Sequence, residues 1–184
     1  MRTVTKLGES SLNISRSKFL GYCKPITNEF EAEEFLKEIK RKHPQAKHIV
    51  YVYKVEPNIV KKFNSSEPSG TGAPPILSII EKNQLTNIVV AVVRYFGGVL
   101  LGTGGLVRAY GDTATEAITT AIIKELTMYH KYQVKLKYNE VSIIEKLDLI
   151  VLDRDFSETI KYTVATKSDN LPFDDVIYLE DVWL

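Results

Sequence analysis

The stretch Ile88-Val89-Val90-Ala91-Val92-Val93-Arg94-Tyr95-Phe96-Gly97-Gly98-Val99-Leu100-Leu101-Gly102-Thr103-Gly104-Gly105-Leu106 decides the fold of this chain. An uninterrupted apolar run over residues 88–93 is typical of a strand that is covered on both faces. The glycine-rich segment 97–105 then predicts a turn. A helix follows, with apolar side chains at helical spacing as far as Ile122. A buried strand, a turn and an amphipathic helix in this order favour an α+β domain.

The preceding part of the chain supplies further elements of the same kind. Residues 14–23 and 49–55 are predicted strands. Asn28, followed three residues later by Glu31, is the start signal of a helix that ends at His43-Pro44. Residues 64–75 are rich in Ser, Gly and Pro, which predicts a loop and then a short helix from Pro75 to Ile80.

The composition changes after residue 130, which indicates a second domain. We place the domains at 1–130 and 131–184. The second one is predicted to contain a helix from Asn139 to about residue 147 and strands near 133–138, 149–152, 159–166 and 176–183. This order resembles a split β-α-β sandwich, a ferredoxin-like arrangement, whose second helix is reduced to a turn.

Charge and cysteine content restrict the classes of function. The net charge is +1, but residues 1–144 carry 20 Lys and Arg against 13 Asp and Glu, whereas residues 145–184 carry 4 against 10. A basic body suits an anionic partner, and it equally suits mutual attraction of the two domains. The single cysteine, Cys23, and the absence of an apolar leader favour a cytoplasmic protein without disulfides. The spacing of His43 and His48 across a proline is unfavourable for a metal site, and no cofactor is expected.

The glycine-rich turn is the candidate binding site. It holds five of the ten glycines of the chain, and it would expose backbone N–H groups at a helix N-terminus to an anion. Arg94 and Arg108 flank it, and Arg94 should emerge where the buried strand ends. Tyr95, Phe96 or Tyr110 could stack on bases. The structural alternatives are a tight packing turn for the glycines, an Arg108–Asp112 ion pair, and core positions for the aromatic side chains. The segment matches neither the dinucleotide fingerprint nor the P-loop.

Three strings together resemble the signature of the YigZ/IMPACT family: Glu67-Pro68-Ser69-Gly70-Thr71, Arg94-Tyr95-Phe96-Gly97-Gly98, and the stretch Leu101–Tyr110. Ser15–Gly21 and His43–His48 add to the resemblance, which runs to about Ala121. It implies a first domain similar to domain 2 of ribosomal protein S5 and a smaller ferredoxin-like second domain. Eukaryotic relatives act in translational control by competing for the activator of an amino-acid-starvation kinase, and prokaryotic relatives have no settled activity.

The resemblance carries over no catalytic residues, and a binding protein is favoured over an enzyme. The chain has Asn64-Ser65-Ser66 where the family usually has acidic residues and glycine, Val50 in place of a cysteine, and Gly72-Ala73 in reversed order. These departures weaken a metal or acid–base site built on that loop. Ser69, Thr71, His48 and Glu67 could be assembled into a nucleophilic site, but nothing in the sequence requires one.

Three functions are open at this point. The first is a translation-associated module that binds a protein or ribonucleoprotein, such as a ribosome or a translation-regulatory protein. The second is RNA or DNA binding through Arg94, Arg108, Lys18 and Arg16, and the third is a phosphate or nucleotide site. The candidate site residues are Arg94, Tyr95, Gly97, Gly98, Gly102, Gly104, Gly105, Arg108, Tyr110, Glu67, Ser69, Thr71 and His48.

Overall fold

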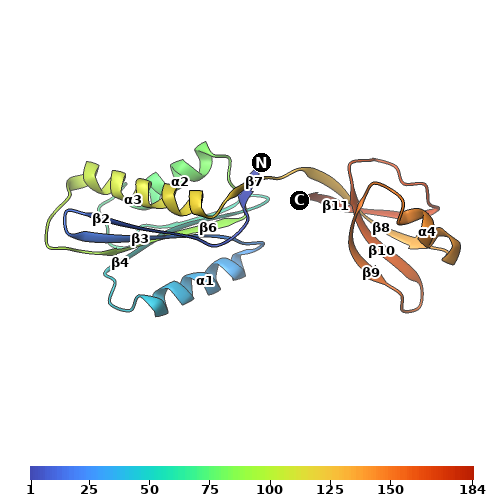
Figure 1. Ribbon diagram of the computed structural model, residues 1–184, viewed down its shortest axis with the longest axis horizontal. Coiled ribbons are helices and arrows are strands. Elements are labelled where there is room, and N and C mark those ends of the chain that lie inside the picture. Colours follow the sequence, from blue (N-terminus) through green and yellow to red (C-terminus); the bar gives the residue numbers. More distant parts are fainter. The chain divides into compact units, whose positions relative to one another are not determined.

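The computed structural model describes residues 1–184, which divide into two compact units, Met1–Glu125 and Leu126–Leu184. The fold is a mixed α/β one with three sheets and four α-helices (Figure 1). At this level it agrees with the α+β class expected from the sequence. Residue 130 lies inside β8 (Met128–Leu136), and all of β8 belongs to the second unit. None of the helices is both long enough and apolar enough to cross a lipid bilayer.

A five-stranded antiparallel sheet in the order β2-β3-β6-β4-β5 forms the centre of the first unit. Its strands are β2 (Gly8–Ile14), β3 (Ser17–Pro25), β4 (His48–Val55), β5 (Ile59–Phe63) and β6 (Ile88–Tyr95). The apolar run 88–93 is fully buried in the middle strand, as predicted. The predicted strand 14–23 is interrupted, because Ser15 and Arg16 have positive φ and form the turn between β2 and β3.

Helices cover both faces of this sheet, α1 (Glu29–Lys42) on one side and α2 (Ala73–Lys82) with α3 (Gly102–Thr120) on the other (Figure 1). The predicted start of α1 is confirmed, because the Asn28 side chain accepts the N–H of Glu31 at 2.9 Å. The carboxylate of Glu31 accepts from Thr27 rather than from Asn28. The two donors satisfied here would otherwise be left open at the helix end.

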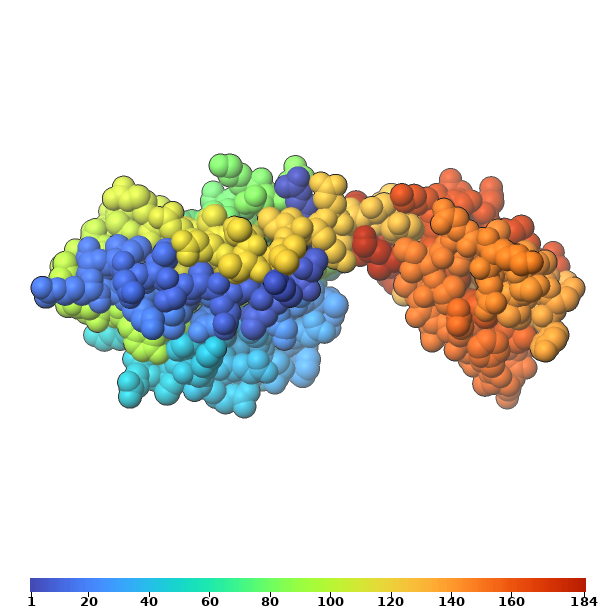
Figure 2. Space-filling view, in the orientation of Figure 1, coloured from blue at the N-terminus to red at the C-terminus, as the bar shows by residue number.

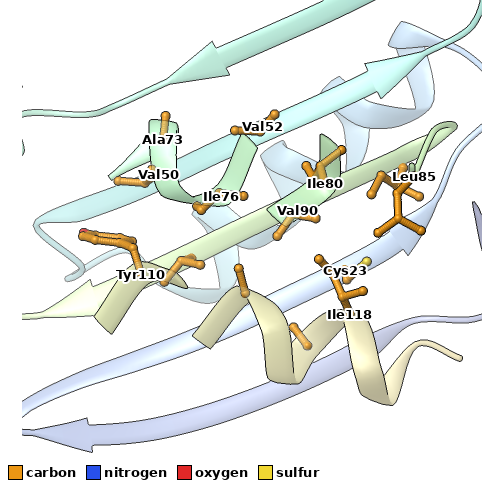
Figure 3. Close-up of a cluster of buried hydrophobic side chains, with 14 of the residues drawn as sticks. Cys23, Val50, Val52, Ala73, Ile76, Ile80, Leu85, Val90, Tyr110 and Ile118 are labelled. Carbon is orange, nitrogen blue, oxygen red and sulfur yellow. The ribbon is translucent and has the colours of Figure 1, made fainter. Parts of the chain in front are cut away.

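Two apolar layers hold the helices on the sheet. In the layer under α2 and α3, Ile76 and Ile80 pack over Val50, Val52 and Val90 (Figure 3). The layer under α1 contains Phe35, Leu36 and Ile39 together with residues of β3, β4 and β6. Each fully buried Ile or Leu side chain contributes about 1.5–3 kcal/mol relative to an exposed one.

The long helix α3 differs from the predicted one at both ends. It begins at Gly102, so Gly104 and Gly105 lie in its first turn and not in the preceding loop. It ends at Thr120, and Ile122 is 53% exposed with a positive φ. The chain turns there into β7 (Ile123–Glu125), which pairs with β1 (Arg2–Val4). Figure 2 shows the N-terminal segment (blue) lying along α3 (yellow) on the surface of this unit.

The second unit is a four-stranded antiparallel sheet in the order β11-β8-β10-β9. The other strands are β9 (Ile150–Asp155), β10 (Ile160–Thr166) and β11 (Asp175–Trp183). The helix expected over 139–147 is much shorter than predicted: a 3₁₀ turn (Tyr138–Glu140) leads into α4 (Val141–Ile144). Ile144 is its buried anchor, and it packs in a cluster with Tyr132, Val134 and Tyr162.

Candidate functional site

A pocket of about 390 Å³ opens where β4 begins, β6 ends and α3 starts. It lies wholly within the first unit. Four predicted site residues line it, namely His48, Glu67, Arg94 and Gly102. The remaining lining residues were not among the candidate site residues, although Phe96 was offered as a stacking side chain; they are Lys47, Ser66, Pro68, Phe96, Leu100, Leu101, Thr103 and Leu106.

Glu67 is the polar centre of this pocket. Its carboxylate is 2% exposed and accepts from Nη1 of Arg94, at 2.8 Å to Oε1 and 3.0 Å to Oε2. The hydroxyl of Tyr110 donates to Oε1 at 2.6 Å. Burial, reinforced by the hydrogen bond to this carboxylate, raises the pKa of Tyr110 far above its ordinary value, so the hydroxyl keeps its proton. The network therefore joins the loop, the central strand and α3 through one buried charge.

Arg94 is not free to bind phosphate, contrary to the prediction that its side chain emerges at the strand end. Because β6 continues to Tyr95, Arg94 still sits between neighbouring strands, with Phe19 and His48 as its register partners. Its guanidinium lies 5.5 Å from the Phe19 ring centre and 5.4 Å from that of Phe96, a cation–π arrangement. The side chain is 6% exposed, and its Nε is a buried donor without a partner.

The two tyrosines predicted to stack on bases have structural roles instead. Tyr110 is fully buried and packs edge-on against Phe19 with ring centres 5.4 Å apart. The hydroxyl of Tyr95 lies 2.9 Å from Nδ1 of His43, whose Nε2 is 2.7 Å from the hydroxyl of Tyr22. Both tyrosines are thus tied into the protein by their polar ends; the ring of Tyr110 is buried, whereas that of Tyr95 is half-buried.

His48 borders the pocket as a neutral imidazole. Burial lowers its pKa below the ordinary 6.5, against the opposing attraction of Glu67. Its Nδ1 lies 3.3 Å from Oγ of Ser66 and 3.7 Å from Oε1 of Glu67. Both neighbours face the same ring nitrogen, so these three residues do not form a relay in which one nitrogen serves the acid and the other serves the hydroxyl.

Ser69 and Thr71, which were considered as members of a nucleophilic site, do not reach His48. Ser69 is exposed, and the Thr71 hydroxyl donates to the carbonyl of Pro68 at 2.7 Å. This is turn chemistry of the kind that Ser and Thr commonly supply in loops.

Asn64 holds the loop that carries Glu67, and sequence reasoning missed it. Its Oδ1 accepts from the N–H groups of Gly72 and Ala73 at 3.1 and 2.9 Å, at the start of α2. Its Nδ2 donates to the Glu67 carbonyl at 2.9 Å. The only sequence signal was an asparagine at the beginning of a loop, a residue that often bonds to nearby backbone.

The five glycines of the predicted turn fall into different environments. Gly97 packs against the β2–β3 turn, where an added Cβ would lie 2.0 Å from the Arg16 carbonyl oxygen. Gly98 and Gly102 have φ of +81° and +71°, which disfavours other residues. Gly104 and Gly105 belong to the first turn of α3.

Arg108 is exposed on α3. It forms no ion pair with Asp112, so the structural alternative considered for this side chain is not realised.

Four exposed apolar side chains come from the segment that borders the pocket, and we refer to them together as the apolar patch: Phe96, Val99, Leu100 and Val107. Their exposed fractions are 43%, 38%, 87% and 39%. The first three come from the loop between β6 and α3, and Val107 comes from the second turn of the helix. Phe96 and Leu100 also line the pocket. Clustered exposed apolar side chains of this kind often mark a binding surface.

A known protein family matches the part of the chain that contains the pocket. The model of the Impact N-terminal domain covers residues 15–118, more than half of the chain. The chain belongs to the IMPACT family. The member of this family called YvyE from Bacillus subtilis (strain 168) is 31% identical over 87% of this chain and 76% of its own length. An IMPACT family member from Thermus thermophilus, described by its place in the pol 5′ region, is 41% identical over 73% of each chain.

A solved structure is also similar to this IMPACT family protein. It is a crystal structure of a hypothetical protein with 26% sequence identity and a TM-score of 0.66, and the match covers 90% of this chain and 84% of that one.

Proposed function

We propose that this protein is a translation-associated binding module of the cytoplasm that engages a protein partner through the apolar patch. The observation that carries the proposal is the patch itself, in which Leu100, in the loop between β6 and α3, is 87% exposed. Gly97 packs against the β2–β3 turn, and Leu101 is the N-cap residue of α3. Exposed apolar side chains next to a pocket are typical of interaction surfaces.

The burial of two candidate groups, rather than the charge of this surface, favours a protein over a nucleic acid. Arg94 is consumed by Glu67, and Tyr110 is buried, so two of the groups that a nucleic-acid interface would use are unavailable. Arg108, Arg16 and Lys18 stay exposed. Nucleic-acid binding depends on several phosphate contacts, whereas protein interfaces centre on apolar anchors with a polar rim.

The role in translation comes from the family, as set out for its eukaryotic relatives. We further infer that the first unit is of the ribosomal protein S5 domain 2 type and that the second is ferredoxin-like. The strand order of the second unit, fourth-first-third-second within that unit, supports the latter, since a split β-α-β sheet has its first and third strands in the middle. The long loop between β10 and β11 stands where such a fold would have its second helix.

The test is co-sedimentation of the full chain with crude ribosomes, salt-washed ribosomes and purified ribosomal RNA, at about 0.1 M and about 0.5 M salt. We expect the protein to pellet with crude ribosomes at both salt concentrations, because an apolar contact is insensitive to ionic screening. Leu100→Asp should reduce the pelleted fraction about tenfold, which corresponds to the loss of one buried anchor.

Phe30→Asp is the matched control. Phe30 is 72% exposed in the first turn of α1, which covers the opposite face of the sheet, so this variant makes the same change of chemistry elsewhere. It should pellet like the parent. If pelleting instead follows naked RNA and falls steeply with salt, the nucleic-acid alternative is correct; if neither ribosome fraction retains the protein, the proposal is wrong.

A further inference from the structure

The pocket beside the apolar patch contains a charged pair that stability alone does not account for. Burying both Glu67 and Arg94 removes two charges from water, which a pair of apolar residues would avoid. Arg94 is among the residues that line the pocket, and its buried Nε has no acceptor within the protein. A buried donor without an acceptor is rare in folded proteins and calls for an explanation, such as a water molecule, an ion or a ligand beside it.

The N-terminus of α3 supplies more donors to the same pocket. Gly102 and Thr103 line it, and they form the first turn of a helix of 19 residues. The N–H groups of a first turn have no partner within the helix, and the helix dipole adds positive potential there. No side chain caps this end, and no acidic residue occupies its first turn. Lys47 adds a positive charge to the pocket lining.

The other walls restrict the guest. Phe96, Leu100, Leu101 and Leu106 make much of the lining apolar, so the guest needs an apolar body. The carboxylate of Glu67 is also part of the lining, and it repels a group with two negative charges more strongly than a group with one. A phosphate monoester, which carries nearly two charges, is therefore disfavoured relative to a carboxylate.

We infer that this pocket binds an amphipathic carboxylic acid, with the carboxylate at the N-terminus of α3 and the apolar body against Phe96 and the three leucines. The inference does not rest on the proposed partner. The same chemistry has two sources: a free small acid, or the C-terminal carboxylate of a peptide that ends in an apolar residue.

The experiment is an NMR titration of the full chain that follows the backbone amides of Gly102, Thr103 and Gly104. The probes are N-acetyl-L-leucine, its uncharged amide, a pentapeptide ending in leucine, the C-terminal amide of that peptide, and inorganic phosphate. We expect saturable shifts of these amides with the two acids, and affinity at least about tenfold lower for each amide partner.

Thr103→Asp is the decisive variant. An acidic residue in the first turn of a helix favours folding, yet it places a negative charge where the ligand's carboxylate would bind. This variant should lose about tenfold or more in affinity for the acids while keeping its thermal midpoint. Thr103→Asn, which has a similar shape without the charge, should bind the acids as the parent does.

The outcomes separate cleanly. A preference for acids over amides that Thr103→Asp removes supports the inference. If the pentapeptide acid binds more tightly than N-acetyl-L-leucine, the source is a chain terminus. If the pentapeptide acid binds equally or more weakly, the source is a small acid. Equal binding of acids and amides, binding of phosphate alone, or no shift with any probe overturns the inference. Ribosome association and acid binding are measured in separate experiments, and Thr103→Asp changes only the carboxylate site, so failure of one proposal does not imply failure of the other.

Discussion

A single nitrogen of Arg94, Nη1, bridges both carboxylate oxygens of Glu67, although the two residues lie 27 positions apart in the chain. This contact holds the loop between β5 and α2 against the end of the central strand β6. The contact also forms part of the pocket wall, because Glu67 and Arg94 both line the pocket.

Glu67→Gln should destabilise the protein by about 3–5 kcal/mol, because it leaves the Arg94 guanidinium buried without a counter-charge. Urea unfolding monitored by circular dichroism measures this change. Glu34→Gln is the matched control, since Glu34 pairs with Lys37 at an exposed position, and it should change stability by no more than about 0.5 kcal/mol. Equal effects of the two substitutions would contradict the burial argument.

Tyr110→Phe should cost about 1.5–3 kcal/mol, the usual contribution of a hydrogen bond to a charged group. The substitution keeps the ring that packs on Phe19 and removes only the donor to Glu67. Tyr138→Phe provides the comparison, because Tyr138 is 90% exposed and should tolerate the change without effect. An unfolding midpoint of Tyr110→Phe equal to that of the parent would show that the hydroxyl contributes nothing.

Two glycine substitutions should act in opposite directions. In Gly97→Ala the new Cβ would meet the Arg16 carbonyl oxygen at 2.0 Å, so the hairpin turn must shift, at a cost of about 1–3 kcal/mol. In Gly111→Ala the new methyl group makes ordinary contact with Ile79 at 3.6 Å, and the helix gains up to about 1 kcal/mol. Thermal unfolding of the two variants beside the parent distinguishes a midpoint that falls from one that rises.

The protein should lose stability as the pH falls below about 6.5, in part through His43. Burial and the neighbouring Lys42 and Lys18 lower the pKa of this histidine in the folded state, so the unfolded chain takes up the proton first. The loss begins near the unfolded pKa and levels off once the pH is below the folded one. His48, with its pKa also lowered by burial, acts in the same direction.

NMR titration of the imidazole rings checks this directly, and urea unfolding at several pH values gives the slope. The slope should be smaller in His43→Gln than in the parent. A midpoint for the His43 ring at or above 6.5 in the folded protein would contradict the expected sign.

The long, regular elements of the first unit were predictable from sequence, because their signals are repeated many times. The run 88–93 and the periodic apolar face of α3 are of this kind. The start of α3 was not predictable, since glycines usually indicate a turn, whereas here Gly102, Gly104 and Gly105 occupy the first turn of the helix. The edge strand β5 was missed because four of its five residues are exposed, so it shows no buried side to the reader of the sequence.

The candidate site was predictable only as a set of residues. The glycine-rich turn with its flanking arginine, and the family resemblance, made His48, Glu67, Arg94 and Gly102 candidate site residues, and the structure places all four around one pocket. The sequence could not show that Arg94 forms an ion pair with Glu67, because this pairing depends on how distant segments meet and leaves no local pattern. The apolar contribution of Leu100 and its neighbours was hidden for the same reason.

The pairing of β1 with β7 gives the first unit adjoining ends, since Arg2 and Glu125 are partners across a two-stranded ribbon. A segment whose ends meet can be transplanted as a cassette into a surface loop of a host protein, and it can be recut to start at another loop without rearranging its main sheet. With the same architecture, a different domain can follow residue 125 while the unit that contains the pocket stays unchanged.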